Sequence, residues 1–308
     1  MKRIVDVSQT GRHLARKHGF MTISENGIEI GRIALDEIQA LIVHAHGVTY
    51  SNSLLISLAE TGVITVLCNA NHFPIAYITA LDGHHSQTGR IAGQLNAKLP
   101  IKKQMWKQII VQKIKMQAAV LSAFDLPYAR LLIFSKSVKS GDQYNIEAQA
   151  ARHYWPLIMG KGFLRDRNAD GANALLNYGY TVLRASVARA VIASGLHPSI
   201  GIHHHNISNP FTLADDLIEP FRPLVDITVK GMLIQGICTV TPEAKNILTK
   251  ILTLDLDLGK TRSPVTTAIN NLCLSVVHSF KIGRVQLSLP SDCMPIEFKH
   301  LGKNDGNL

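Results

Sequence analysis

The residues best suited to metal chemistry lie in two neighbouring segments of the chain. Three consecutive histidines occupy positions 203–205, and an acidic segment with Asp215, Asp216 and Glu219 follows after a short loop. Imidazole nitrogens and carboxylate oxygens are donors that bind divalent metal ions. The ordinary alternative for the histidine run is a loop in which one ring packs and two are solvated. The nearby carboxylates raise the case for a metal site, and the rest of the sequence must decide between the two.

The acidic segment has a helical spacing. Glu219 lies three residues after Asp216 and four after Asp215, so on a helix these side chains would share one face. Carboxylates on one face repel each other unless a cation, a proton or a basic partner lies between them. The alternative is a solvated acidic helix N-terminus, favoured by the helix dipole and capped by Thr212. This segment alone does not decide between the two interpretations.

A third carboxylate adjoins a predicted buried stripe. Ile146, Ala150 and Tyr154 fall at helical spacing, and Glu147 lies directly beside that stripe. A carboxylate in such a position is usually paired, and Arg152 is the expected partner. The local pattern therefore does not by itself select Glu147 for chemistry.

The composition indicates a globular, basic protein. The chain has 308 residues, 46% of them hydrophobic, and a formal net charge of +10. This composition argues against intrinsic disorder, and the positive charge favours a polyanionic partner, nucleic acid first. With charged Asp6 near the N-terminus and no apolar run of about 20 residues, we expect neither a secretory signal nor a membrane span. Four cysteines without CxxC spacing predict small buried side chains in a reducing compartment, hence a cytoplasmic protein: Cys68, Cys238, Cys273 and Cys293.

Short apolar runs bounded by turn residues predict a β-rich domain over residues 1–81. The expected strands lie at 21–23, 28–30, 39–43, 63–67 and 75–78. Asn26-Gly27 predicts a tight hairpin turn, and Ser51 is the expected cap of a helix at 51–60. A polar, glycine-bearing stretch then predicts a linker over 82–99.

Helical periodicity dominates the remainder, residues 100–308. Helices are expected at 105–124 and, most clearly, at 172–193, where an apolar stripe precedes a helix stop at Gly195. Gly179 inside the second helix predicts close packing of another backbone or side chain. The predicted fold class is α+β, with a small N-terminal β-rich domain followed by a larger all-helical catalytic domain.

Four sequence blocks together resemble the CRISPR-associated integrase family, Cas1. They are Ile-Glu-Ala-Gln-Ala-Ala-Arg-His-Tyr-Trp at 146–155, Asn-Ala-Leu-Leu-Asn-Tyr-Gly-Tyr-Thr-Val-Leu at 173–183, Gly-Leu-His-Pro-Ser-Ile-Gly-Ile-His-His at 195–204 and Leu-Ala-Asp-Asp-Leu-Ile-Glu-Pro-Phe-Arg-Pro at 213–223. The order and spacing of the blocks match, and so does the β-rich part before the helical part. The resemblance spans nearly the whole chain, and the length and short linker are most similar to the versions in type II systems.

The resemblance implies roles for individual residues. The family's metal-binding and catalytic positions match Glu147, His204 and Glu219, and Asp216 matches a nearby acid one helical turn earlier. Many relatives carry aspartate at the position of Glu219. His205 is the fallback for the imidazole, because the triple histidine leaves the register open by one residue.

The resemblance also implies a reaction and partners. A 3′-hydroxyl of a short DNA fragment, or prespacer, would attack a phosphodiester at a repeat end of a CRISPR array, in a transesterification assisted by Mg²⁺ or Mn²⁺. The implied partners are double-stranded DNA, a second copy of the chain joined through residues 1–81, and the small protein Cas2. No membrane is implied.

Basic and aromatic residues near the blocks are candidate DNA contacts. Each arginine alone is more typical of a surface or structural residue, and Tyr178 either stacks on a base or packs in the core. The lysines at 102, 103, 107, 113 and 115 have the pattern of a solvated helix face. The arginine candidates are Arg165, Arg167, Arg184, Arg189 and Arg222.

Three other functions are open at this point. A DNA endonuclease would use water instead of the 3′-hydroxyl at the same residues, and it would cleave DNA without joining strands. A DNA-binding scaffold would be indifferent to loss of Glu147 or His204. A small-molecule metallohydrolase would bind its substrate independently of salt.

Overall fold

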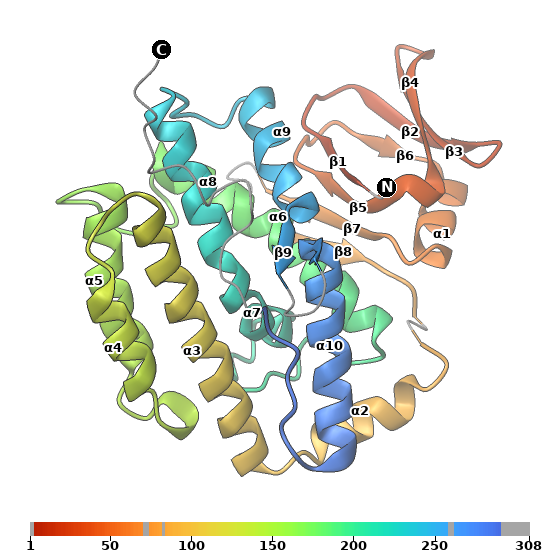
Figure 1. Ribbon diagram of the computed structural model, residues 1–308. Coiled ribbons are helices and arrows are strands. Elements are labelled where there is room, and N and C mark those ends of the chain that lie inside the picture. The colour runs from red at the N-terminus through yellow and green to blue at the C-terminus, as the bar shows by residue number, and fades with distance from the viewer. Residues whose placement is uncertain (1–2, 70–73, 82–83, 258–261, 291–308) are drawn as a thin grey trace. The chain divides into compact units, whose positions relative to one another are not determined.

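The computed structural model describes residues 3–69, 74–81, 84–257 and 262–290, and it divides into two compact units, Met1–His85 and Ser86–Leu308 (Figure 1). The first unit is rich in strands and the second is mostly helical, which confirms the predicted fold class. Among the predicted buried cysteines, Cys273 is buried, Cys68 is partly buried and Cys238 is exposed, and Cys293 lies outside the described residues. None of the described helices is both long and apolar enough to cross a membrane.

Strands of the first unit form two sheets within its described part. In one sheet β1 (Arg3–Val7), β5 (Ile38–Val43) and β7 (Ile64–Cys68) run parallel, and β8 (Pro74–Ile78) pairs antiparallel with β7. The other sheet has the order β4-β3-β2-β6, from β4 (Ile28–Ala34), β3 (Phe20–Glu25), β2 (Arg12–Lys17) and β6 (Thr49–Tyr50). The predicted strands are all present.

Two local sequence signals in this unit are confirmed by their geometry. Asn26 and Gly27 both have positive φ, 49° and 79°, as a tight turn between β3 and β4 requires. The hydroxyl of Ser51 accepts a hydrogen bond of 3.3 Å from the backbone N–H of Leu54 and so caps α1 (Asn52–Glu60).

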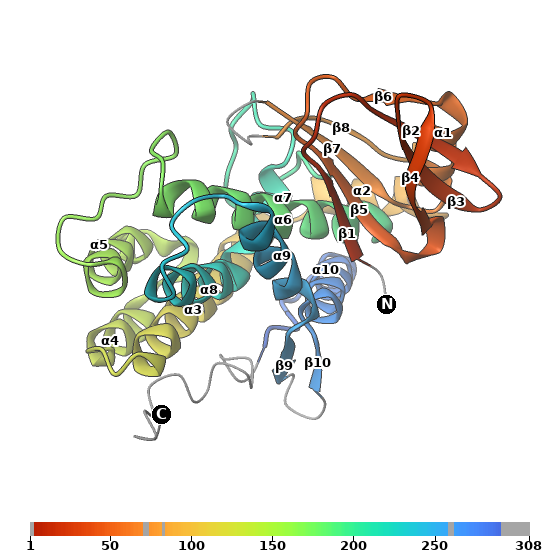
Figure 2. The same cartoon turned by 90° about the horizontal axis from the view of Figure 1, so that it is seen from above.

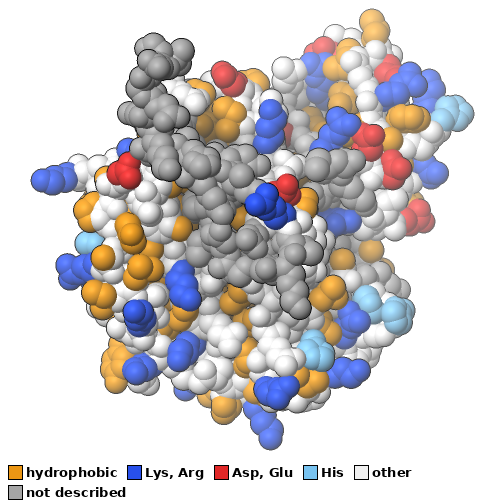
Figure 3. Space-filling model, in the orientation of Figure 1, with side chains coloured by type: hydrophobic (Ala, Val, Ile, Leu, Met, Phe, Trp, Pro, Cys, Tyr) orange, Lys and Arg blue, Asp and Glu red, His pale blue; other side chains and the backbone are white. Residues whose placement is uncertain are grey.

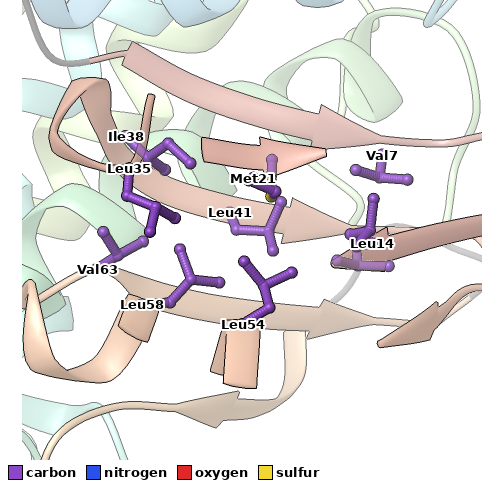
Figure 4. Packing of buried hydrophobic residues seen from close by; sticks show 10 residues of the cluster. Val7, Leu14, Met21, Leu35, Ile38, Leu41, Leu54, Leu58 and Val63 are labelled. Carbon is purple, nitrogen blue, oxygen red and sulfur yellow. The ribbon is translucent and has the colours of Figure 1, made fainter. Parts of the chain in front are cut away.

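The core of the first unit lies between its sheets and α1. All six residues of β5 are buried, and its Leu41 packs with Leu14, Met21 and Leu54 in the cluster of Figure 4. The other members come from β1 and β5, from α1, and from the residues just before β5 and β7: Val7, Ile38, Val43, Leu58, Leu35 and Val63.

The second unit is a helical assembly. In Figures 1 and 2, α4 and α5 lie beside α3, which also packs against α8. One antiparallel ribbon, β9 (Asp255–Asp257) with β10 (Arg262–Pro264), is an addition to the expected all-helical pattern. The helices are α2 (Gln87–Leu95), α3 (Leu99–Ala123), α4 (Ala129–Ser137), α5 (Ile146–Met159), α6 (Ala172–Ala193), α7 (Thr212–Ile218), α8 (Arg222–Ile234), α9 (Pro242–Lys250) and α10 (Val265–Ile282), with single turns η1 (Leu35–Glu37, in the first unit), η2 (Ser140–Asp142), η3 (Glu219–Phe221) and η4 (Ile251–Thr253).

The linker predicted over 82–99 was wrong for most of its length, because α2 occupies it. This helix packs on α10 and buries Gln94. The side-chain amide of Gln94 donates to the carbonyls of His197 (3.0 Å) and Ile200 (2.7 Å), and its oxygen accepts from the N–H of His197 (2.9 Å). These contacts are more than 100 residues apart in sequence, so local glycine content could not reveal them. The consequence is that α2 holds the loop that leads to the histidines.

Helix α6 has the predicted bounds and the predicted close contact. The N–H of Gly195 donates to Ile192, and Gly195 has φ 67°, as a helix stop requires. A Cβ on Gly179 would lie 2.4 Å from Cγ1 of Val225 in α8 and 3.3 Å from Leu248 in α9. Glycine therefore sets the distance at which α6 and α8 cross.

We expect Gly179→Ala to lower the free energy of unfolding by about 1–3 kcal/mol, because the methyl group overpacks the α6–α8 crossing. Gly231→Ala in α8 is the matched control, since in the described structure its Cβ would meet no atom within 4 Å. The control should gain up to about 1 kcal/mol from helix propensity. Urea denaturation followed by far-ultraviolet circular dichroism measures both, and equal effects would contradict the packing argument.

Candidate metal centre

A buried carboxylate organises the histidine loop. Asp216 in α7 is fully buried, and its Oδ2 accepts the backbone N–H groups of Ile202 (2.6 Å) and His203 (2.8 Å). Its Oδ1 accepts the N–H of His204 (3.3 Å) and lies 2.5 Å from Nδ1 of the same imidazole. With Nδ1 engaged by a carboxylate, Nε2 of His204 is the nitrogen left for a ligand. Asp216 thus fixes both the loop backbone and the orientation of one ring.

Glycine at position 201 allows this loop to close. A Cβ on Gly201 would lie 2.4 Å from the carbonyl oxygen of His204 and 3.0 Å from Oδ2 of Asp216. Thr212, predicted as the cap of the acidic helix, is instead the first residue of α7, and Phe211 is the N-cap. The hydroxyl of Thr212 donates to the carbonyl of Ser199 in the folded loop.

Two carboxylates from distant segments converge on one lysine. Nζ of Lys113 in α3 lies 2.5 Å from Oε1 of Glu147 in α5 and 2.5 Å from Oε2 of Glu219 in η3. Nε of Arg222 lies 2.7 Å from Oε1 of Glu219. Lys113 rather than Arg152 is therefore the partner of Glu147, because the packing of α3 on α5 brings it there.

The first turn of α5 is fixed by side-chain caps. Asp142, itself buried, accepts the N–H groups of Ile146 (2.9 Å) and Glu147 (3.0 Å). Asn145 adopts a left-handed conformation (φ 51°), and its side chain accepts from the N–H of Ala148. These bonds fix the backbone position from which the side chain of Glu147 projects.

The charges around Glu219 set its protonation. Burial alone would raise its pKa, but Arg222 and Lys113 outweigh burial and lower the pKa to about 2. Burial would lower the pKa of Lys113, yet Glu219 and Glu147 raise it. The hydrogen bond to Asp216 raises the pKa of His204 against the effect of burial. At neutral pH the site therefore contains an ionised Glu219 beside two cations.

The donor set suits a hard divalent ion. Two carboxylates and one imidazole match Mg²⁺ or Mn²⁺, with the imidazole favouring Mn²⁺. Oε2 of Glu219 is buried and lies 2.5 Å from Nζ of Lys113, so this oxygen faces a cation position. In the described part of the chain, no group of three or more His, Cys, Asp or Glu side chains is close enough as it stands to hold an ion. The donors fit by type, and Lys113 lies between the two carboxylates.

The other two histidines have different surroundings. The ring of His203 stacks on Trp106 at 4.3 Å between centroids with an angle of 2°, and His205 is exposed. Burial lowers the pKa of His203. In the described structure His204 is the member of the run whose ring contacts Asp216, so the geometry supports His204 over His205 as the candidate ligand.

Three of the candidate DNA-binding arginines have protein partners. Arg184 forms a two-pronged pair with Asp215 (2.6 and 2.7 Å). The guanidinium groups of Arg165 and Arg222 lie 5.4 and 4.7 Å from the ring centre of Tyr180. Each therefore has a contact within the protein, and its contact with DNA stays a prediction.

The remaining candidates differ in exposure. Arg167 is exposed and Arg189 is partly buried. Tyr178 is fully buried, and Nζ of Lys245 lies 5.3 Å from the centre of its ring. Its ring has no face open for a nucleobase, so stacking on DNA was the wrong alternative and packing in the core is correct.

Two residues of this region were missed in the sequence. Lys113 was grouped with solvated lysines. It nevertheless lies three residues after Ile110 and four before Gln117, both of which are on the buried face of α3. A lysine at a core position of an amphipathic helix was the signal available.

Asp226 is the second, and it lies in an apolar run of α8. It accepts hydrogen bonds from the hydroxyls of Tyr154 (3.1 Å) and Tyr180, and burial raises its pKa to about 6. Because Tyr180 carries Arg222 on its ring, this buried network extends to Glu219.

Comparisons with known proteins agree on one family. The family profile "CRISPR associated protein Cas1" matches residues 5–250. The CRISPR-associated endonuclease Cas1 of Neisseria meningitidis serogroup C (strain 8013) is 36% identical over 298 residues, covering 94% of this chain and 96% of that protein. Two solved structures share the fold. A casposase bound to integration product has a TM-score of 0.81 at 19% identity, with 96% of this chain and 95% of that chain covered. A chain of a Cas6-RT-Cas1–Cas2 complex has a TM-score of 0.72 at 12% identity, with 94% and 36% covered.

We expect Lys113→Met to lower the free energy of unfolding by about 2 kcal/mol near neutral pH, because it leaves two carboxylates short of a cation. The depressed pKa of Glu219 contributes stability above its ordinary value of 4.5, and that contribution is lost as the pH falls toward about 2. The deficit of the variant should therefore shrink below pH 4.5. Urea titrations at several pH values measure it, with exposed Lys115→Met as control. A deficit independent of pH would contradict the ion-pair assignment.

Proposed function

The chain belongs to the Cas1 family, and from this premise we propose that it is a metal-dependent integrase that inserts short DNA fragments into a CRISPR array. The observation that carries the proposal is the convergence of Glu147 and Glu219 on one cation position. His204, whose pKa both carboxylates influence, is held by Asp216 with Nε2 left for a ligand.

In the proposed reaction a 3′-hydroxyl of the fragment attacks a phosphodiester at a repeat end. One phosphodiester forms as another breaks, so no external energy source is needed. A divalent ion held by Glu147, His204 and Glu219 would acidify the hydroxyl and neutralise charge on the phosphoryl oxygens.

The chain's own residues prepare this site. Asp216 keeps the imidazole of His204 in one orientation. Arg222, stacked on Tyr180 and paired with Glu219, fixes the carboxylate and adds positive charge beside the reacting phosphate.

DNA is the proposed substrate and Cas2 a proposed partner. The net charge of +10 favours a polyanion, and Lys and Arg side chains are spread over the visible surface of the helical unit in Figure 3. The two similar structures, a casposase bound to integration product and a Cas6-RT-Cas1–Cas2 complex, support both assignments.

Hydrolysis of DNA is the alternative activity. The Neisseria meningitidis relative is named an endonuclease, and water in place of the 3′-hydroxyl would use the same three residues. The two activities differ only in the nucleophile, so a substrate that reports joining as well as cleavage separates them.

We expect a short duplex with a labelled 3′-terminal strand to become joined to a repeat-containing plasmid when Mn²⁺ or Mg²⁺ is present. Glu147→Ala and Glu219→Ala should each slow joining by at least about 100-fold, since loss of a group that only orients a ligand already costs about 10- to 100-fold. Glu243→Ala in α9, an exposed acid, is the control and should join normally. Cleavage without joining would favour the endonuclease, and DNA binding without joining or cleavage, unchanged in both alanine variants, would favour a scaffold.

We also propose that the first unit joins two copies of the chain. We expect the interface to lie near residues 25–43, at β4 rather than at β5, because all six residues of β5 are already buried within their own unit. Edge strand β4, in contrast, exposes 70% of Ile28 and 51% of Ile30. Apolar side chains beside an unpaired strand edge suit a second copy.

Light scattering should then give about twice the chain mass of 33.8 kDa. Ile28→Lys together with Ile30→Lys should give a monomer at the same concentration, because charge on this edge opposes pairing. Ile75→Lys on β8 is the matched control, since Ile75 is 69% exposed in the other sheet. A monomeric wild type would contradict the proposal.

A further inference from the structure

Lys113 is the residue of the candidate metal centre for which the proposed reaction has no use so far. It projects from α3 into the packed interface with η3, and only 12% of its side chain is exposed. Its ammonium nitrogen is equally distant, 2.5 Å, from one oxygen of Glu147 and one of Glu219. These are the two carboxylates proposed as metal ligands.

An ammonium and a divalent ion cannot both occupy this position. Mg²⁺ and Ca²⁺ lie about 2.0–2.6 Å from carboxylate oxygens, which is the distance at which Nζ of Lys113 already lies. Two cations that each need both oxygens at such a distance exclude one another by size and by charge. Binding of one therefore requires release of the other.

We propose that Lys113 is an internal counter-cation that competes with the divalent metal ion for Glu147 and Glu219, and that metal binding displaces its ammonium group from the pair. The inference rests on the proposed metal site. Lys113 keeps its proton throughout, and the exchange is a change of ion partners with no covalent step.

The side-chain chemistry of Lys113 and Arg222 indicates that Lys113, and not Arg222, is the cation that metal displaces. Lysine carries a compact charge on a flexible four-carbon stem, so it can leave without moving α3. The guanidinium of Arg222 is held 4.7 Å from the ring centre of Tyr180 while it contacts the other oxygen of Glu219, Oε1. Arg222 therefore stays in place, and Lys113 is the cation that can move.

The exchange changes the charge of the site. Glu147, Glu219, Lys113 and Arg222 together sum to zero, whereas the same four groups with a divalent ion sum to +2. The site becomes attractive to a phosphate only after the ion has entered, and the displaced ammonium adds to that attraction. Entry of metal and approach of DNA are thereby coupled.

Calorimetric titration of the full chain with Mn²⁺ tests the competition. Lys113→Met should bind Mn²⁺ about tenfold more tightly or better, because the ion no longer has to displace a competing positive charge from the two carboxylates. Lys113→Arg, which keeps the competing charge, and exposed Lys115→Met should bind no more tightly than the wild type. Equal or weaker binding by Lys113→Met overturns the proposal.

A second measurement uses the wild-type protein, so it stands even where a variant folds poorly. Amine acetylation, read by mass spectrometry, should modify Lys113 slowly relative to Lys115, and saturating Mn²⁺ should raise the ratio several-fold. An unchanged ratio overturns the displacement.

Glu147→Gln separates this inference from the proposed function. If Glu147→Gln loses Mn²⁺ binding but Lys113→Met binds Mn²⁺ no more tightly than the wild type, the proposed competition is wrong and the proposed metal site stands. Unchanged Mn²⁺ binding in Glu147→Gln places the ion elsewhere, and then the proposed metal site and the competition are both wrong.

Discussion

The side chains of Glu147 and Glu219, 72 residues apart in the sequence, meet in a mostly buried part of the helical unit. Their negative charges must be neutralised there, and this requirement determines which residues surround them. Glu219 is buried, and Glu147, which keeps 25% of its side chain exposed, begins at a capped helix start beside it. Lys113 supplies charge from α3, and Arg222 supplies it from the turn that follows Glu219. A buried ion pair is weak support for stability, because the cost of dehydration offsets the attraction. Its presence here is better explained by chemistry than by folding.

The histidine loop is held by a different principle. Its backbone donors converge on Asp216, and the missing side chain of Gly201 makes room for that carboxylate. This explains why glycine, histidine and aspartate occur together in the sequence. Gly201 leaves room for the loop to fold against Asp216, Asp216 accepts the loop's backbone amides, and His204 offers Nε2 to a ligand.

The sequence predicted what depends on neighbours along the chain. Periodicity located α6 and the strands, Asn26 located a turn, and Ser51 located a cap, because each rests on contacts within a few residues. Helix α2 depends on Gln94 reaching a loop about 100 residues away, and Lys113 depends on two partners from other helices. The resemblance to a family located Glu147 and Glu219, whereas the cation between them required the packed structure.

The anchoring of the histidine loop has a consequence for its motions. Three successive amides, those of Ile202, His203 and His204, donate to the two oxygens of one side chain. Opening of the loop is therefore a concerted step, since all three amides lose their acceptor together when the loop separates from Asp216. The three should behave as one small cooperative unit, exposed to solvent hydrogen exchange together and protected together.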